Sequence, residues 1–65
     1  MFIELTTTKG EKITLNIQNI VLIAPDKKGT ILVDVNGLDW QLSDSYESLK
    51  EILRAFAADK PIKNV

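Results

Sequence analysis

Apolar and polar residues alternate in the first part of the chain, and this alternation predicts a pair of β-strands. One run covers residues 3–6 and the other covers residues 12–17, with Thr8-Lys9-Gly10 between them. A three-residue loop that ends in glycine places Leu5 opposite Ile13 and gathers the apolar residues of both strands on one face. A two-residue turn would divide them between two faces, so the three-residue loop is favoured.

Three further strands are predicted in the middle of the chain. Residues 20–24 are aliphatic throughout, and the strand that they form ends at Pro25, which cannot donate a backbone hydrogen bond. Residues 30–35 and 38–42 flank Asn36-Gly37, a dipeptide typical of two-residue type I′ hairpin turns. The third strand is therefore followed by a second hairpin.

The residues after the last strand predict one helix. Asp44 and Glu47 fit a variant capping box in which aspartate replaces the usual serine or threonine. Apolar side chains then recur at helical spacing and would face the sheet: Tyr46, Leu49, Ile52, Leu53 and Phe56. Asp59-Lys60-Pro61 ends the pattern because proline cannot continue a helix.

These elements predict an α+β fold that is mainly β: a five-stranded antiparallel meander, or a small open barrel, with one C-terminal helix packed on it. Residues 1–58 are expected to form a single domain, and residues 59–65 a flexible C-terminal tail. The apolar residues expected in the core are Ile3, Leu5, Ile13, Leu15, Val21, Ile23, Ile31, Val33, Val35, Leu38, Trp40 and Leu42.

The composition removes most enzyme chemistry from consideration. The chain has 65 residues and contains neither cysteine nor histidine. Disulfides and thiolate zinc sites are therefore excluded, and the commonest metal ligand and general base near neutral pH is missing. A chain of this length forms one domain of marginal stability, which good packing or self-association has to supplement. We expect no enzyme, no cofactor and no metal site.

Charge and hydropathy narrow the choice of partners. Eight basic and nine acidic residues give a net charge of −1, and the densest basic cluster is Lys27-Lys28. A dedicated nucleic-acid-binding protein carries a basic excess on one face, so nucleic acid is disfavoured as a partner. The longest apolar run, residues 20–24, has five residues, and the start of the chain shows no signal-peptide pattern. We expect no membrane insertion and a cytoplasmic location.

Two carboxylates and one indole are candidate site residues. The two-residue turn at Asn36-Gly37 places Asp34 directly opposite Asp39, on the face away from the core. Like charges in that arrangement are mildly destabilising, which would suit a cation site, acid–base chemistry or the reception of a partner's lysine. Two solvated carboxylates are the favoured interpretation, because two carboxylates alone make a poor metal site. Trp40 could stack on a ligand, but its phase with the neighbouring apolar residues favours a place in the core.

One apolar cluster is left on the face that the helix cannot cover. If the third strand turns Ile23 into the core, then Phe2, Ile20, Leu22 and Leu32 point outward together. A contiguous exposed apolar group indicates an interface, so we expect a homo-oligomer or docking on another protein. Two alternatives stay open: the barrel curls far enough to bury part of the cluster, or the phase of the third strand is shifted by one residue.

Several of these motifs also occur together in a known family. They are Gly10-Glu11, Ile13-Thr14-Leu15-Asn16, Asn19-Ile20-Val21, Asn36-Gly37, and Leu49 with Ile52 after a serine-rich helix start. Over residues 2–53 this pattern resembles the FlbD/SwrD-like family of small bacterial flagellar and swarming-motility proteins, which implies a motility-related accessory role without catalytic residues. The same strands, followed by residues 48–52 in the helix, resemble part of the LytTR DNA-binding domain. That second resemblance implies the alternative function, a nucleic-acid-binding regulatory module.

Overall fold

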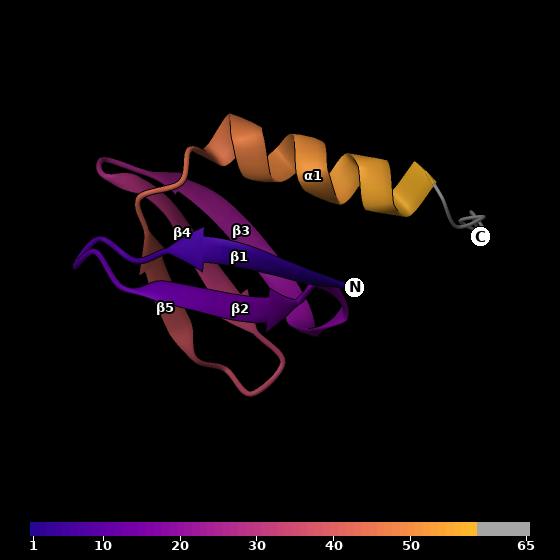
Figure 1. The fold of residues 1–65 in the computed structure, drawn as a ribbon, viewed down its shortest axis with the longest axis horizontal. Helices are drawn as coiled ribbons and strands as arrows, with labels where there is room; N and C mark the ends of the chain where they lie inside the picture. Colours follow the sequence, from indigo (N-terminus) through magenta and orange to yellow (C-terminus); the bar gives the residue numbers. More distant parts are fainter. Residues whose placement is uncertain (59–65) are drawn as a thin grey trace.

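The computed structural model describes residues 1–58, which form five β-strands and one C-terminal helix (Figure 1). In chain order the elements are β1 (Phe2–Thr6), β2 (Lys12–Asn16), the 3₁₀ turn η1 (Ile17–Asn19), β3 (Ile20–Asp26), β4 (Gly29–Asp34), β5 (Asp39–Leu42) and α1 (Tyr46–Ala58). The predicted fold class, mainly β with one C-terminal helix on an open antiparallel meander, is confirmed. The predicted tail, residues 59–65, lies outside the described residues.

The strands form two antiparallel sheets. β1 pairs with β2, and β3, β4 and β5 form a second sheet in that order. An isolated bridge between Thr7 and Leu42 joins the sheets, and beside it the Ser43 N–H donates to the Thr6 carbonyl at 2.8 Å. The sheets do not close into a barrel, and α1 lies along their upper side in Figure 1. The two sheets and the helix therefore enclose the core together.

The first hairpin has the predicted register. Leu5 pairs with Ile13, and the Gly10 N–H donates to the Thr7 carbonyl at 2.9 Å to close the loop. Gly10 has a φ of +88°, in the left-handed region that glycine adopts without strain. The three-residue loop is therefore confirmed.

The second hairpin differs from the prediction by one residue. Its loop is Val35-Asn36-Gly37, and within it Gly37 alone has a positive φ, at +81°. The Asp34 N–H donates to the Leu38 carbonyl at 3.1 Å, so these two residues close the ladder. The predicted two-residue type I′ turn, which needs a positive φ at Asn36 as well, is wrong. An aspartate at the first position and a glycine at the fourth are typical of the type I turn that forms here.

The core lies where the two sheets and the helix meet. Its buried centre, the core cluster, takes one leucine from each of β1, β4, β5 and α1: Leu5, Leu32, Leu42 and Leu49. The partly buried side chains packed against it are Ile3, Ile13, Leu15, Ile20, Ile23 and Trp40. The predicted core positions that this arrangement confirms are Ile3, Leu5, Ile13, Leu15, Ile23, Trp40 and Leu42.

The one-residue shift in the second hairpin reverses the faces of β4. Leu32, opposite Trp40, points into the core and is 0% exposed. Its neighbours on either side, which the two-residue turn would have placed in the core, point outward instead. The residues whose predicted core positions are wrong for this reason are Ile31, Val33 and Val35. The predicted core position of Leu38 is wrong as well, because Leu38 precedes β5 at the turn and is exposed.

An irregularity in β3 also changes which residues face the core. The pairing with β4 shifts between Ile20 and Leu22, which leaves Val21 as the extra residue of a β-bulge. Val21 is exposed, so its predicted core position is wrong, whereas Ile20 packs against the core cluster. Beyond the bulge the alternation resumes, and Ile23 lies in the core as predicted.

α1 begins after Ser45. The Ser45 hydroxyl accepts a hydrogen bond from the Ser48 N–H at 3.1 Å, which makes Ser45 the N-cap. The carboxylate of Asp44, the predicted cap, instead accepts from the Thr6 N–H at 2.8 Å. The Asp44 carbonyl accepts from the Thr30 hydroxyl at 2.7 Å. Asp44 therefore ties β1 and β4 to the start of the helix, and its prediction as the cap is wrong.

Candidate interaction surfaces

The four residues predicted to form an outward apolar cluster do not share a surface. Leu32 belongs to the core cluster, and Ile20 packs against that cluster. Phe2 and Leu22 are exposed, but they belong to different sheets. The predicted set of Phe2, Ile20, Leu22 and Leu32 is therefore wrong, because β4 has the opposite phase and β3 carries a bulge.

A different apolar surface lies on the outside of the three-stranded sheet. Leu22 pairs with Val33 and Ala24 pairs with Ile31, and directly paired side chains lie on the same face of a sheet. These four residues, which we name the outer apolar face, point away from the core because Leu32 between them points into it. Leu22 is 51% exposed, and the other three residues are half-buried.

The predicted acidic pair of Asp34 and Asp39 does not form. Asp39 pairs with Val33 and is exposed, whereas Asp34 is turned inward and is 6% exposed. The two carboxylates therefore lie on opposite faces of the hairpin. A cation site, acid–base chemistry or the reception of a partner's lysine between them loses its geometric basis.

The Asp34 carboxylate has a structural role. It accepts hydrogen bonds from the backbone N–H groups of Asn36 at 2.9 Å and Leu38 at 3.1 Å, and from the Trp40 Nε1–H at 3.1 Å. The bond from Trp40 is the main cause that lowers the pKa of Asp34; burial opposes it, and the two backbone bonds assist it. Asp34 is thus held as an anion that fixes both the turn and the orientation of the indole.

Trp40 contributes to the core and to the surface. As predicted, its side chain packs against the core cluster, and its Nε1–H is bound to Asp34. The residue also lines an open cavity of about 280 Å³ between the β1–β2 loop and β5. The other lining residues are Thr7, Thr8, Lys9, Glu11, Asp39 and Gln41. The sequence did not predict this cavity, because its two walls come from segments far apart in the chain.

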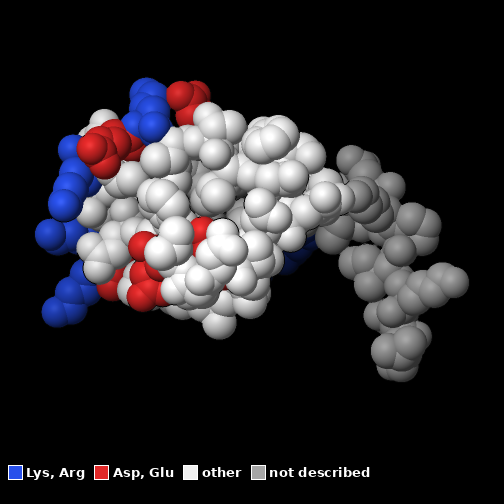
Figure 2. All heavy atoms as spheres, turned by 90° about the horizontal axis from the view of Figure 1, so that it is seen from below, with Lys and Arg blue, Asp and Glu red and all other residues white. Residues whose placement is uncertain are grey.

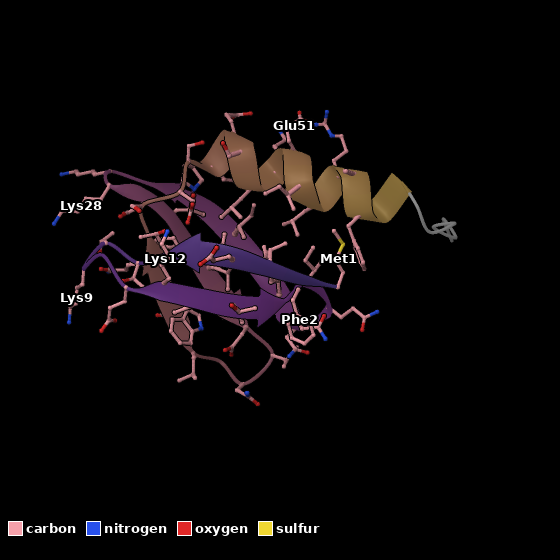
Figure 3. All side chains as sticks on the ribbon, in the orientation of Figure 1. Met1, Phe2, Lys9, Lys12, Lys28 and Glu51 are labelled. Atoms are coloured by element: carbon pink, nitrogen blue, oxygen red, sulfur yellow. The ribbon has the colours of Figure 1, made fainter. Side chains whose placement is uncertain are left out.

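Lysine side chains gather at one end of the molecule. Lys9 and Lys12 belong to the first hairpin and Lys27-Lys28 to the turn between β3 and β4, and both hairpin tips lie at that end (Figures 2 and 3). Acidic atoms lie among them in Figure 2, so this end is mixed in charge. Within residues 1–58, the ion pair that forms is the exposed Arg54–Glu51 pair of α1, at 3.6 Å. The lysine end is therefore an exposed surface whose cations have no ion-pair partner in that part of the chain.

Two kinds of feature are absent from the described residues. Residues 1–58 contain no group of three or more histidine, cysteine, aspartate or glutamate side chains that could hold a metal ion. Over the same range, no helix has the length and apolar character needed to cross a membrane. The surface features that could bind a partner are the outer apolar face, the cavity beside Trp40 and the lysine end.

Comparison with known proteins found no match: no protein-family model, no curated protein and no solved structure matches this chain. The resemblances to the FlbD/SwrD-like family and to part of the LytTR domain therefore stay predictions from the sequence. The function has to be inferred from the surfaces of the molecule.

Proposed function

We propose that this protein is a small non-catalytic interaction module that self-associates through the outer apolar face. The observation that carries the proposal is the pairing of Leu22 with Val33 and of Ala24 with Ile31 on the side of the sheet away from the core. β4 thereby has apolar residues on both of its faces, since Leu32 is buried on the other side. Strands that are apolar on both faces are typical of sheets that are covered on both faces.

A second copy of the chain is the occupant that suits this face. A chain of 65 residues buries only about 60% of the surface that its unfolded form exposes, so a further buried face adds stability that the monomer lacks. Binding of a second copy to the folded form alone stabilises that form by mass action. A twofold axis, the commonest symmetry of homo-oligomers, brings the same face of both copies together.

The face of the sheet suits this contact better than the edge of β3. β3 is an outer strand of its sheet, and an outer strand can pair with a strand of another copy. The bulge at Val21 disrupts the strand at one end, and Pro25, which has no N–H, interrupts it toward the other. Both features discourage pairing at the edge, so stacking of the two faces is favoured.

The non-catalytic part of the proposal rests on the composition and on Asp34. The chain has no histidine or cysteine. The buried carboxylate accepts three hydrogen bonds that hold it in the charged form. A group fixed in this way supports a turn and is poorly placed to exchange protons with a substrate. The proposed links to bacterial motility and to the cytoplasm rest on the resemblance and on the sequence pattern alone.

Analytical ultracentrifugation over a range of protein concentrations tests the proposal. We expect the wild type to show a reversible monomer–dimer equilibrium. The Leu22→Lys variant is expected to stay monomeric, because a lysine on each copy places like charges in the contact. Thr14→Lys is the matched control: it adds the same charge at an exposed position of β2, and we expect it to associate as the wild type does.

Circular dichroism melting curves establish whether both variants are folded. A wild type that stays monomeric at every concentration would rule out self-association. A folded Leu22→Lys variant that associates like the wild type would show that the outer apolar face is not the contact.

The nucleic-acid-binding alternative has one observation in its favour, the lysine end. Contacts between a few lysines and phosphates give weak binding that depends strongly on salt. Retention of duplex DNA that is lost when Lys27-Lys28 is changed to two glutamines would favour this alternative. No retention at low salt would remove it.

A further inference from the structure

The open cavity of about 280 Å³ between the β1–β2 loop and β5 has fixed walls. On one side, the Thr7 hydroxyl oxygen accepts hydrogen bonds from the N–H groups of Lys9 at 3.3 Å and Glu11 at 3.1 Å, which hold the loop in shape. On the other side, the Thr8 N–H donates to the Gln41 carbonyl at 2.9 Å and holds β5 against the loop. A ligand that enters a cavity with fixed walls orders few protein groups, so little binding energy is lost.

Trp40 gives this cavity an aromatic wall. Its Nε1–H donates to the Asp34 carboxylate at 3.1 Å, so the indole keeps one orientation. Asp34 does not line the cavity, and its carboxylate therefore acts on the ring from outside it. Because the acceptor is an anion, the hydrogen bond polarises the indole and strengthens its attraction for a cation at the ring face.

The charges around the cavity are unequal. Glu11 and Asp39 contribute two carboxylates and Lys9 contributes one ammonium group, and all three residues are exposed. As far as residues 1–58 are concerned, none of the three forms an ion pair. The cavity therefore combines an aromatic wall with an excess of negative charge.

We propose that this cavity binds an arginine side chain presented by another protein. A guanidinium group is planar, so it stacks on an indole while its N–H groups donate to a neighbouring carboxylate. Glu11 lines the cavity from the loop and Asp39 lines it from β5, so an acidic residue is present on each side. Lys9 repels a cation, but it opposes two carboxylates with a single charge.

The size of the cavity supports a single side chain as the occupant. Pockets for small molecules usually have volumes of about 300–1,000 Å³, and this cavity lies just below that range. The site goes beyond the proposed self-association, because Glu11 and Lys9 lie on the β1–β2 loop and the outer apolar face lies on β3 and β4. Asp39, which pairs with Val33, lies at the border between the two surfaces. It names a second kind of partner, one with an exposed arginine.

Titration with N-acetyl-argininamide, followed by the fluorescence of the single tryptophan of the chain, tests this proposal. We expect saturable binding of the arginine derivative. N-acetyl-citrullinamide, which has the same shape without the charge, is expected to bind at least about fivefold more weakly. Glu11→Gln is expected to weaken arginine binding about two- to fivefold, the usual size of one exposed charge pair. Lys9→Gln removes the competing cation and is expected to tighten binding by a similar factor.

Equal binding of the citrulline derivative, or no saturable binding of either compound, would overturn the proposal. Weaker arginine binding by Lys9→Gln would overturn it as well, since the ammonium group would then attract the ligand. Both substituted residues are exposed, and melting curves establish that the variants are folded. Ultracentrifugation of Glu11→Gln separates the two proposals, because this variant is expected to bind arginine more weakly and to keep the dimer.

Discussion

Asp34 determines the register of the second hairpin. Burial of a carboxylate is costly unless hydrogen bonds replace the water that it loses. Asp34 obtains these bonds from Asn36, Leu38 and Trp40 because the loop has three residues and the side chain points inward. A two-residue turn would expose the carboxylate and would leave the indole N–H without this acceptor. One polar residue therefore decides which face of β4 enters the core.

We expect Asp34→Asn to destabilise the protein at neutral pH, because a neutral amide makes weaker hydrogen bonds with the indole and the backbone than a carboxylate does. The pKa of Asp34 in the folded state lies below its ordinary value of 3.8, mainly because of the bond from Trp40. The charged carboxylate therefore stabilises the fold above pH 3.8. This contribution is lost as the pH falls through the lowered folded-state pKa.

Urea denaturation followed by circular dichroism, from about pH 2 to about pH 7, measures this dependence. The difference in unfolding free energy between the wild type and Asp34→Asn is expected to shrink toward the acid end. Asp39→Asn, at an exposed position of the same hairpin, controls for the loss of one negative charge. If the unfolding free energies of the wild type and Asp34→Asn differ by the same amount at every pH, the role of the charged carboxylate would be contradicted.

Among the elements, the first hairpin and the helix were predictable because their signals are local. Residues 3–6 and 12–17 have apolar side chains in one phase only, so a single register gathers them on one face. The helix likewise has one apolar side, and only its cap was misplaced. Asp44 has the right side chain for a cap, but it is engaged by Thr6, and Ser45 takes its place.

β3 and β4 were not predictable in the same way, because their apolar patterns do not indicate the face that enters the core. Residues 20–24 contain no polar position, so the pattern gives no sign of the bulge at Val21. In β4 the pattern favours the wrong phase, because Ile31 and Val33 alternate with Leu32 and two polar residues, Thr30 and Asp34, that are buried in the structure. Asn36-Gly37 fits both loop lengths. The deciding contact is the hydrogen bond from the Trp40 indole to the Asp34 carboxylate across the hairpin, which the alternation of apolar and polar residues does not indicate.

The candidate surfaces were difficult to predict from the sequence for the same reason. The outer apolar face depends on the phase of β4. Because the predicted loop was one residue too short, Leu32 was assigned to the outer face and Ile31 and Val33 to the core, whereas the structure shows the reverse. The cavity depends on the bridge between Thr7 and Leu42, which joins distant parts of the chain. A signal for the correct phase was present in the sequence: an aspartate three residues before Gly37 is typical of a type I turn.

The phase of β4 can be tested by truncating two adjacent side chains. We expect Leu32→Ala to lower the unfolding free energy by about 2–5 kcal/mol, the usual cost at a fully buried leucine. Val33→Ala, on the outer apolar face, is expected to cost no more than about 1 kcal/mol. Urea denaturation at a protein concentration that keeps the chain monomeric measures both values. A larger loss of unfolding free energy for Val33→Ala than for Leu32→Ala would mean that Val33 faces the core, as the two-residue turn implies.

At the scale of the whole molecule, the lysine end and the outer apolar face constrain how two copies can meet. Lys27-Lys28 closes the hairpin that carries Leu22 and Val33, so the lysine end lies at one end of the outer apolar face. Stacked sheets keep their strands roughly aligned, which leaves a parallel and an antiparallel arrangement of the two copies. The parallel arrangement would bring the lysines of both copies together, and the antiparallel one separates them. Charge repulsion therefore favours an antiparallel dimer.

Such a dimer couples the stability of the chain to its concentration. If association stabilises the folded form alone, the midpoint of thermal unfolding rises with protein concentration. Over about a hundredfold range of concentration we expect the wild-type midpoint to rise by several degrees, since about 1 kcal/mol moves the midpoint of a domain of this size by roughly 4–8 °C. The midpoint of Leu22→Lys is expected to stay constant over the same range in scanning calorimetry. A constant wild-type midpoint would mean that the core cluster suffices for a stable monomer, and the outer apolar face would then have to be covered by a different protein.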